Sequence, residues 1–273
     1  MKLCSTLSVF GLTLLVATNA SALVIRAYDS SKHDLHTNFP NSPGSNPSFY
    51  HSQYDFSGVG WSVQDSRKHF ALISSRHFVA ANHYLPAQGS QIAFLNQSGQ
   101  VKTYVVARLD TIPNSQGEPT DLTVGTLRDP IPATDGITSY GIAGGAESLF
   151  NGQRILVVGQ SSSVGEGTIS GFLDFGGDPL TGGSGANATR AYQFLYASFG
   201  GTQDDSHCER GDSGSPSFVA SGGQLSVVGI HTAILTTLGS TASVDTFVPA
   251  YASEIAAIMD SQQDNQPPAD PIV

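Results

Sequence analysis

Short apolar runs separated by glycines and polar turn residues fill the middle of this chain, and they restrict the folds open to it. Thirty glycines and few charged residues suit strands joined by turns better than helices. The expected strands are residues 58–63, 70–79, 91–95, 101–109 and 121–127, then 154–159, 167–172, 191–199, 216–219, 225–230 and 242–248. Two sets of about six short strands, joined near residues 130–153, predict an all-β fold of two packed antiparallel six-stranded β-barrels.

The two ends of the chain differ from this pattern. Residues 1–22 combine Lys2, an apolar core at 9–16 and a small-x-small ending, which is the layout of a secretory signal cleaved before Leu23. No later run approaches the roughly 18 apolar residues of a membrane span, so we expect a secreted protein, extracellular or periplasmic. Residues 249–260 carry apolar side chains at helical spacing, which predicts a C-terminal helix.

These patterns divide the chain into four parts. A signal peptide at 1–22 precedes an extension at 23–56 that is rich in Ser, Asn and Pro. The β-rich domain occupies residues 57–260, and residues 261–273 are expected to be a disordered tail.

Charge and cysteine content narrow the possible partners. The chain has 12 basic and 22 acidic residues, and loss of residues 1–22 would leave 11 basic residues. Such an acidic surface repels phosphate backbones, so we expect no nucleic-acid partner. Cleavage would also separate Cys4 from Cys208, so the mature protein is expected to have no internal disulfide and to be held together by packing.

Residues 211–216, Gly-Asp-Ser-Gly-Ser-Pro, are the first candidate for chemistry. A serine between glycines in a tight polar turn can present its hydroxyl as a nucleophile, although the same residue types also form ordinary surface turns. A nucleophilic Ser213 needs a base and a group that orients the base.

Two upstream segments can supply both groups. Residues 71–83 form a β-prone run that ends in small residues and then His83, which leaves room for a substrate beside the imidazole. Asp121 stands at the head of an alternating strand, where its carboxylate can lie under the histidine ring. The order along the chain is therefore His83, Asp121, Ser213.

These motifs resemble those of chymotrypsin-like serine proteases. Residues 80–83, Ala-Ala-Asn-His, resemble the family's Ala-Ala-His with Asn82 inserted, and residues 121–124 resemble its Asp-Ile-Ala-Leu. Residues 211–216 match Gly-Asp-Ser-Gly-Gly-Pro except at Ser215. The separations of 38 and 92 residues between the three candidates are close to those of the family. The resemblance spans residues 57–260 and implies a secreted, trypsin-fold protease without disulfides. Three motifs in the right order are a more specific signal than any one of them alone.

The resemblance also implies a role for each residue. His83 acts as general base and acid, Asp121 orients it, and Ser213 attacks the peptide carbonyl. The backbone N–H groups of Gly211 and Ser213 form the oxyanion hole. The expected partner is a polypeptide substrate, the protein is expected to be a monomer, and neither a metal nor an organic cofactor is needed.

Other residues and functions compete with this interpretation. His77 is the rival base, Cys208 is a rival nucleophile, and the rival acids are Asp110, Asp129 and Asp135. An α/β-hydrolase would require an acid and then a histidine after the serine, and no acid lies between Ser213 and His231. A catalytically inactive, protease-like binding module is the stronger alternative. A metal site at His33, Asp34 and His36 is conceivable but lacks further ligands.

Specificity and activation are left open by the sequence. His231 and Thr232 are candidates for the substrate pocket, and His231 is similar to a histidine with which glutamyl endopeptidases hold a substrate carboxylate. Asp205 resembles the pocket acid of trypsin-like enzymes, which bind Arg or Lys, and a pocket for small or apolar side chains is the third possibility.

In the family's activated enzymes a new N-terminal amine pairs with the aspartate before the nucleophile, here Asp212. The sequence does not decide whether the segment from Leu23, Arg210 or another group plays that part.

Overall fold

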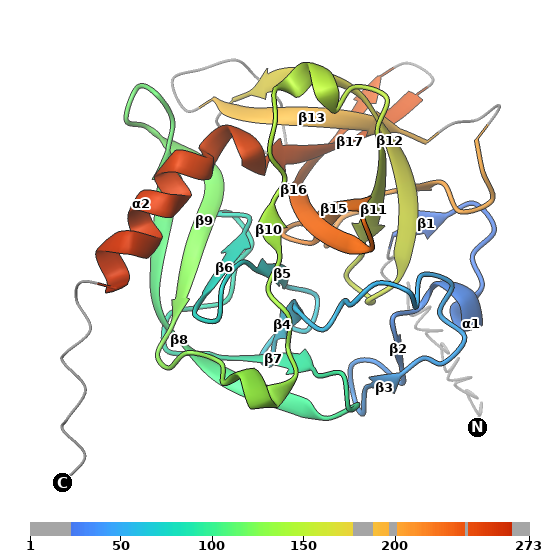
Figure 1. Cartoon of the computed structure of the whole chain (residues 1–273). Coiled ribbons are helices and arrows are strands. Elements are labelled where there is room, and N and C mark those ends of the chain that lie inside the picture. Colours follow the sequence, from blue (N-terminus) through green and yellow to red (C-terminus); the bar gives the residue numbers. More distant parts are fainter. Residues whose placement is uncertain (1–22, 177–187, 197–200, 238–239, 264–273) are drawn as a thin grey trace, which may run out of the picture.

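Six strands from the first half of the chain close into an antiparallel barrel, as the sequence predicts (Figure 1). The computed structural model describes residues 23–176, 188–196, 201–237 and 240–263. The strands are β4 (Val59–Ser62), β5 (His69–Leu72), β6 (His77–Ala80), β7 (Gln91–Leu95), β8 (Val101–Pro113) and β9 (Pro119–Leu127). The expected strand at 70–79 is two strands, because the Ser74 hydroxyl accepts the backbone N–H groups of Arg76 and His77 and forms a turn.

The second half forms a second closed barrel beside the first. Its strands are β11 (Arg154–Val158), β12 (Val164–Phe175), β13 (Thr189–Leu195), β15 (Pro216–Ser221), β16 (Gln224–Thr237) and β17 (Ser240–Phe247). Pairing of β16 with β17 closes this barrel, and β10 (Gly141–Ile142) adds to β16 in parallel. Short 3₁₀ turns lie at Ala133–Asp135, Glu147–Leu149 and Val248–Tyr251. The predicted two-barrel fold is confirmed.

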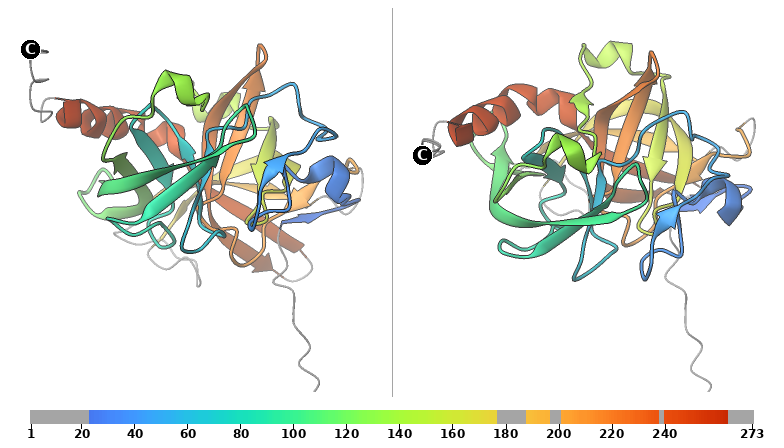
Figure 2. Two further views of the ribbon diagram at one scale, coloured as in Figure 1. Left: turned by 90° about the horizontal axis from the view of Figure 1, so that it is seen from below. Right: turned by 60° about the horizontal axis from the view of Figure 1, so that its bottom comes forward.

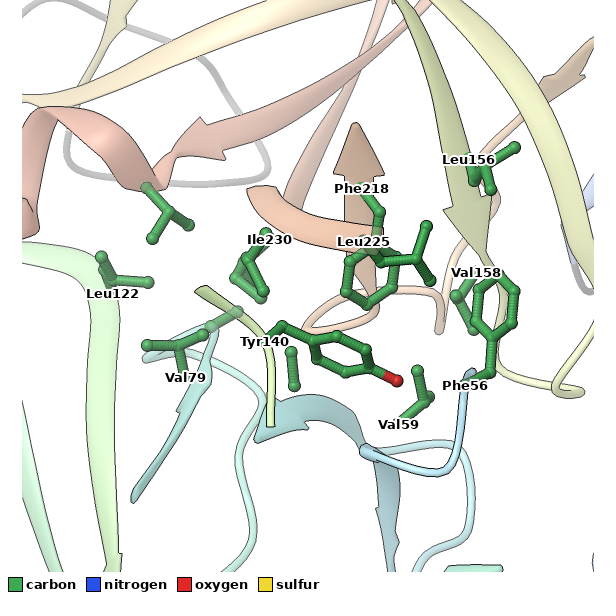
Figure 3. Packing of buried hydrophobic residues seen from close by; sticks show 14 of the residues in the cluster. Phe56, Val59, Val79, Leu122, Tyr140, Leu156, Val158, Phe218, Leu225 and Ile230 are labelled. Atoms are coloured by element: carbon green, nitrogen blue, oxygen red, sulfur yellow. The ribbon is translucent and has the colours of Figure 1, made fainter. Parts of the chain in front are cut away.

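A shared hydrophobic core joins the two barrels (Figure 3). Val79 and Leu122 of the first barrel and Phe218 and Ile230 of the second belong to one buried cluster. Tyr140, on the connection between the barrels, packs in the same cluster (Figure 3). Because this core is continuous, residues on the facing edges of the two barrels keep a constant separation.

The extension packs beside the second barrel and also contacts the first (Figures 1 and 2). Its elements are β1 (Val24–Ile25), α1 (Ser30–His33), β2 (His36–Thr37) and β3 (Gly44–Ser45). Strand β1 pairs with β14 (Ser206–His207), and Lys32 and His33 both contact Asp204. The extension is therefore anchored close to the segment that precedes Ser213.

The predicted C-terminal helix is α2 (Ala252–Gln263), which returns from the second barrel to lie against the first (Figure 1). Its Ile255 is fully buried in the shared core. The helix continues three residues past the expected start of the tail, and residues 264–273 lie outside the described part. The signal-like residues 1–22 and most of the glycine-rich stretch at 176–185 also lie outside it. None of the described helices is long and apolar enough to cross a membrane.

Candidate active site

His83 and Asp121 are brought together by the pairing of β6 with β9. His83 follows the end of β6, and Asp121 lies near the start of β9. The His83 Nδ1 atom lies 2.8 Å from Asp121 Oδ2, and the His83 backbone N–H donates to Oδ1 at 3.0 Å. The carboxylate therefore orients both the ring and the turn that carries it. With the Nδ1 proton directed at Asp121, Nε2 is left to accept a proton.

The second barrel holds the Asp121 carboxylate and backbone in place. The Thr232 hydroxyl donates to Asp121 Oδ2, and the Asp121 backbone N–H donates to Thr189 Oγ1 at 2.9 Å. Thr232, which we expected in the substrate pocket, thus points its hydroxyl at Asp121. Thr189 was not identified from the sequence, because a threonine in an ordinary strand carries no local signal.

Asn82, the departure from the family motif, has a structural role. Its Oδ1 accepts hydrogen bonds from Thr111 Oγ1 at 2.9 Å and Thr123 Oγ1 at 3.0 Å. Thr123 belongs to β9, which pairs with β6, and Thr111 belongs to β8, the next strand of the barrel, so Asn82 ties the His83 turn to β8 and β9. The inserted residue is therefore accommodated by these hydrogen bonds, and His83 and Asp121 still pair.

The turn that carries Ser213 lies against the turn that carries His83. A Cβ on Gly214 would lie 3.1 Å from the Tyr84 carbonyl and 3.7 Å from the Ala81 nitrogen, the residues on either side of the His83 turn. The Gly214 N–H also donates to the His231 carbonyl at 2.9 Å. Within the described residues the Ser213 hydroxyl has no hydrogen-bond partner. Catalytic hydrogen bonds are often long in proteins without substrate, so this geometry is compatible with an active serine.

Gly211 has a backbone conformation that only glycine adopts easily. Its φ is +103°, and a Cβ there would lie 2.4 Å from Gln160 Oε1. Within the described part of the chain, the N–H groups of Gly211 and Ser213 donate to no backbone acceptor. Two free N–H donors on one tight turn match the requirement for an oxyanion hole.

Asp212 is fully buried between the turn that carries Ser213 and the start of the described chain. Its carboxylate accepts the backbone N–H groups of Gln160 at 2.8 Å, Glu209 at 2.7 Å and Leu23. Burial raises the pKa of Asp212 to about 6. Among the open candidates, Leu23 is thus the group in contact with Asp212, whereas the Arg210 side chain is exposed.

The rival residues are occupied elsewhere. His77 pairs its Nδ1 with the Ser74 hydroxyl at 2.9 Å, and burial lowers its pKa. Burial also raises the pKa of Cys208 well above its ordinary value, which keeps this enclosed thiol protonated and unreactive. Among the rival acids, Asp110 pairs with Arg108 and Asp129 is exposed. Asp135 pairs with Lys102 and accepts the Tyr104 hydroxyl.

The two residues considered for specificity have very different environments. Asp205 is buried and forms an ion pair with Arg154 at 2.9 Å, and it also accepts the Thr202 hydroxyl. This pairing neutralises the carboxylate and argues against Asp205 as the acid of a pocket for Arg or Lys. His231 instead lies beside the turn that carries Ser213, because its backbone N–H donates to the Ser215 carbonyl at 2.9 Å. Its ring contacts Asp245, a residue for which the sequence offered no motif.

Neither histidine cluster makes a convincing metal centre. His33 pairs with Asp204 at 3.0 Å, and His36 packs near Trp61, so the metal ligands that we considered do not converge. Elsewhere in the described chain, Cys208, His231 and Asp245 place potential ligand atoms within 4.8 Å of one another. Hydrogen bonds already occupy the Asp245 carboxylate, so we interpret this cluster as hydrogen-bonded and not as a metal site.

Comparison with known proteins adds no relative to these observations. No protein-family model matches the chain, and no curated protein matches its sequence. The fold itself, two six-stranded antiparallel barrels with few helices, resembles the chymotrypsin-like fold.

Proposed function

We propose that this protein is a secreted serine endopeptidase that hydrolyses peptide bonds through Ser213, His83 and Asp121. The observation that carries the proposal is the His83–Asp121 pair, with Nδ1 and Oδ2 2.8 Å apart, beside the glycine-flanked Ser213 turn. The three residues come from different parts of the chain, and this combination of a base, an orienting acid and a partly exposed serine is what acyl transfer requires.

In the proposed mechanism, His83 Nε2 takes the Ser213 proton as the hydroxyl oxygen attacks the peptide carbonyl. The negative charge on the carbonyl oxygen is stabilised by the N–H groups of Gly211 and Ser213. His83 then returns the proton to the leaving amine, and an acyl-enzyme forms. Water, activated by His83 in the same way, hydrolyses the acyl-enzyme and regenerates Ser213. Asp121 stabilises the imidazolium in both halves of the reaction.

An inactive binding module is the second candidate, and one observation favours it. The Ser213 hydroxyl makes no hydrogen bond to His83 in the described chain. A module of this kind would keep the two barrels but would not react with reagents that need an activated serine.

A fluorophosphonate probe separates these two functions, because it modifies only activated serines. We expect the wild-type protein to be labelled and Ser213→Ala and His83→Ala to be unlabelled but folded. Ser215→Ala is the matched control, since Ser215 is a buried serine two residues away whose hydroxyl has no hydrogen-bond partner among the described atoms. Absence of labelling in the folded wild-type protein would overturn the proposal.

For specificity, we propose that the residue before the scissile bond is glutamate, bound through His231. The support is the position of His231, whose backbone pairs with the nucleophile turn, and the neutralisation of Asp205 by Arg154. Cleavage of a mixed peptide library tests this preference. Preferential cleavage after Arg or Lys, or after small apolar residues, would exclude it.

A further inference from the structure

We propose that Asp245 is a positioning residue that holds His231 ready to bind a substrate carboxylate. The inference rests on the proposed function, and it assigns the preference for glutamate to a buried pair and not to His231 alone. Asp245 lies on β17, and its register partner across the sheet is His231 on β16. The His231 Nδ1 atom lies 3.0 Å from Asp245 Oδ1.

The surroundings of Asp245 determine which atoms carry protons. Its second oxygen, Oδ2, accepts hydrogen bonds from the Tyr192 hydroxyl at 2.9 Å and from the Ser217 hydroxyl. Asp245 is completely buried, as are Tyr192 and Ser217, and His231 is 1% exposed. An ionised carboxylate acts as an acceptor only, and both hydroxyls already donate to Oδ2. The Nδ1 atom of His231 must then carry a proton.

The proposal assigns the remaining nitrogen of His231 to the substrate carboxylate. Among the described residues, Nε2 has no hydrogen-bond partner, although the side chain is almost completely buried. When Nε2 is also protonated, the ring becomes an imidazolium that can donate to a substrate carboxylate. The negative charge of Asp245 on the opposite side of the ring stabilises that imidazolium. The substrate carboxylate then need not stabilise the positive charge alone.

Other ionisable groups face His231 from the neighbouring elements. Asp212 lies in the nucleophile turn and interacts electrostatically with His231. Cys208, which follows β14, has its sulfur within 4.8 Å of the His231 and Asp245 ligand atoms, but burial keeps its thiol protonated. Both carboxylates favour a positive charge on His231, and no basic side chain faces it in the hydrogen bonds and ion pairs of the described chain.

The test compares matched peptides with Glu or Gln before the scissile bond, because the two side chains have the same shape and differ in charge. In Asp245→Asn we expect the ratio of kcat/KM for Glu over Gln to fall roughly 10- to 100-fold, the range of a hydrogen bond to a charged group. Labelling by a small alkyl fluorophosphonate, which carries no acidic side chain, reports separately whether Ser213 is still activated in the variant. Tyr192→Phe is the control, because it removes a neutral donor and leaves the His231–Asp245 pair, and we expect its ratio to change little.

The ¹⁵N resonances of His231 give a second readout that loss of packing alone would not change. In the wild-type protein we expect a proton on Nδ1, and this measurement decides if Asp245→Asn does not fold. A proton confined to Nε2, or an unchanged Glu/Gln ratio in folded Asp245→Asn, would overturn the inference.

These outcomes also separate the inference from the proposed function. A wild-type protein that reacts with the fluorophosphonate but cleaves Glu and Gln peptides equally would refute the role of Asp245 and leave the peptidase standing. A wild-type protein that does not react at all would refute the peptidase itself.

Discussion

Release of the Leu23 amine is predicted to change both the stability and the reactivity of this protein through Asp212. The carboxylate is fully buried, and burial raises its pKa to about 6. At Leu23 it accepts a hydrogen bond from a neutral backbone amide. Relative to the ordinary value of 3.8, ionisation of Asp212 at pH 7 then costs about 3 kcal/mol, from 1.36 kcal/mol per pKa unit. An α-ammonium at the same position supplies the missing positive charge.

The sign of the effect follows from linkage between protonation and folding. In a chain that keeps Ser21 and Ala22 before Leu23, the folded pKa of Asp212 lies above the unfolded value. The stability contributed by protonated Asp212 is therefore present below about pH 4 and is lost as the pH rises through about 6. In a chain that begins at Leu23, the ammonium lowers the pKa of Asp212 and removes that loss. We expect the chain beginning at Leu23 to be about 2 to 3 kcal/mol more stable at pH 7.

Urea unfolding, followed by the fluorescence of Trp61, measures this difference in both chains between pH 4 and pH 9. Fluorophosphonate labelling should also be faster in the chain that begins at Leu23, because Asp212 anchors the turn that carries the N–H groups of Gly211 and Ser213. Asp212→Asn is the control, since it should make the two chains equally stable at every pH. Identical pH profiles for the two unmodified chains would refute the reasoning.

Three further predictions test other parts of the structure. Thr232→Val removes the hydroxyl that donates to Asp121, and kcat should fall roughly 10- to 100-fold with little change in stability, as measured by peptide hydrolysis and urea unfolding. Burial lowers the pKa of His36, like that of His69, to about 4, so acidification below the unfolded value of 6.5 should destabilise the protein. His36→Met should recover about 3 kcal/mol of the free energy of unfolding that is lost at pH 4, as measured by urea unfolding. An equal loss of stability with acid in the variant and the wild type would contradict this. Cys208 should react with a thiol reagent only after unfolding, and Cys208→Ser should keep its fluorophosphonate labelling.

Local patterns account for the features that the sequence predicted correctly. Strand-forming residues separated by glycine-rich turns lead directly to two β-barrels, because each strand needs only its neighbours to satisfy its backbone hydrogen bonds. The division of residues 70–79 into two strands was missed, since a serine hydroxyl that accepts backbone N–H groups competes with a continuous strand.

The candidate triad was also found from local sequence, because each of its members lies in a short motif of small or polar residues. The residues that support it carry no such motif. Thr189, Thr232 and Asp245 each lie in an ordinary strand, and each acquires its role from a partner far away in the chain.

Charged residues show most clearly what only the tertiary structure decided. Asp205 had the more familiar motif, but the fold pairs it with Arg154, whereas Asp245 is placed behind His231. A buried carboxylate is tolerated only where the fold supplies hydrogen bonds or an opposite charge, and those partners come from strands distant in sequence. The sequence by itself therefore determined the two barrels and the candidate nucleophile, base and acid. The tertiary structure alone decided which carboxylates are neutralised and which remain beside the site.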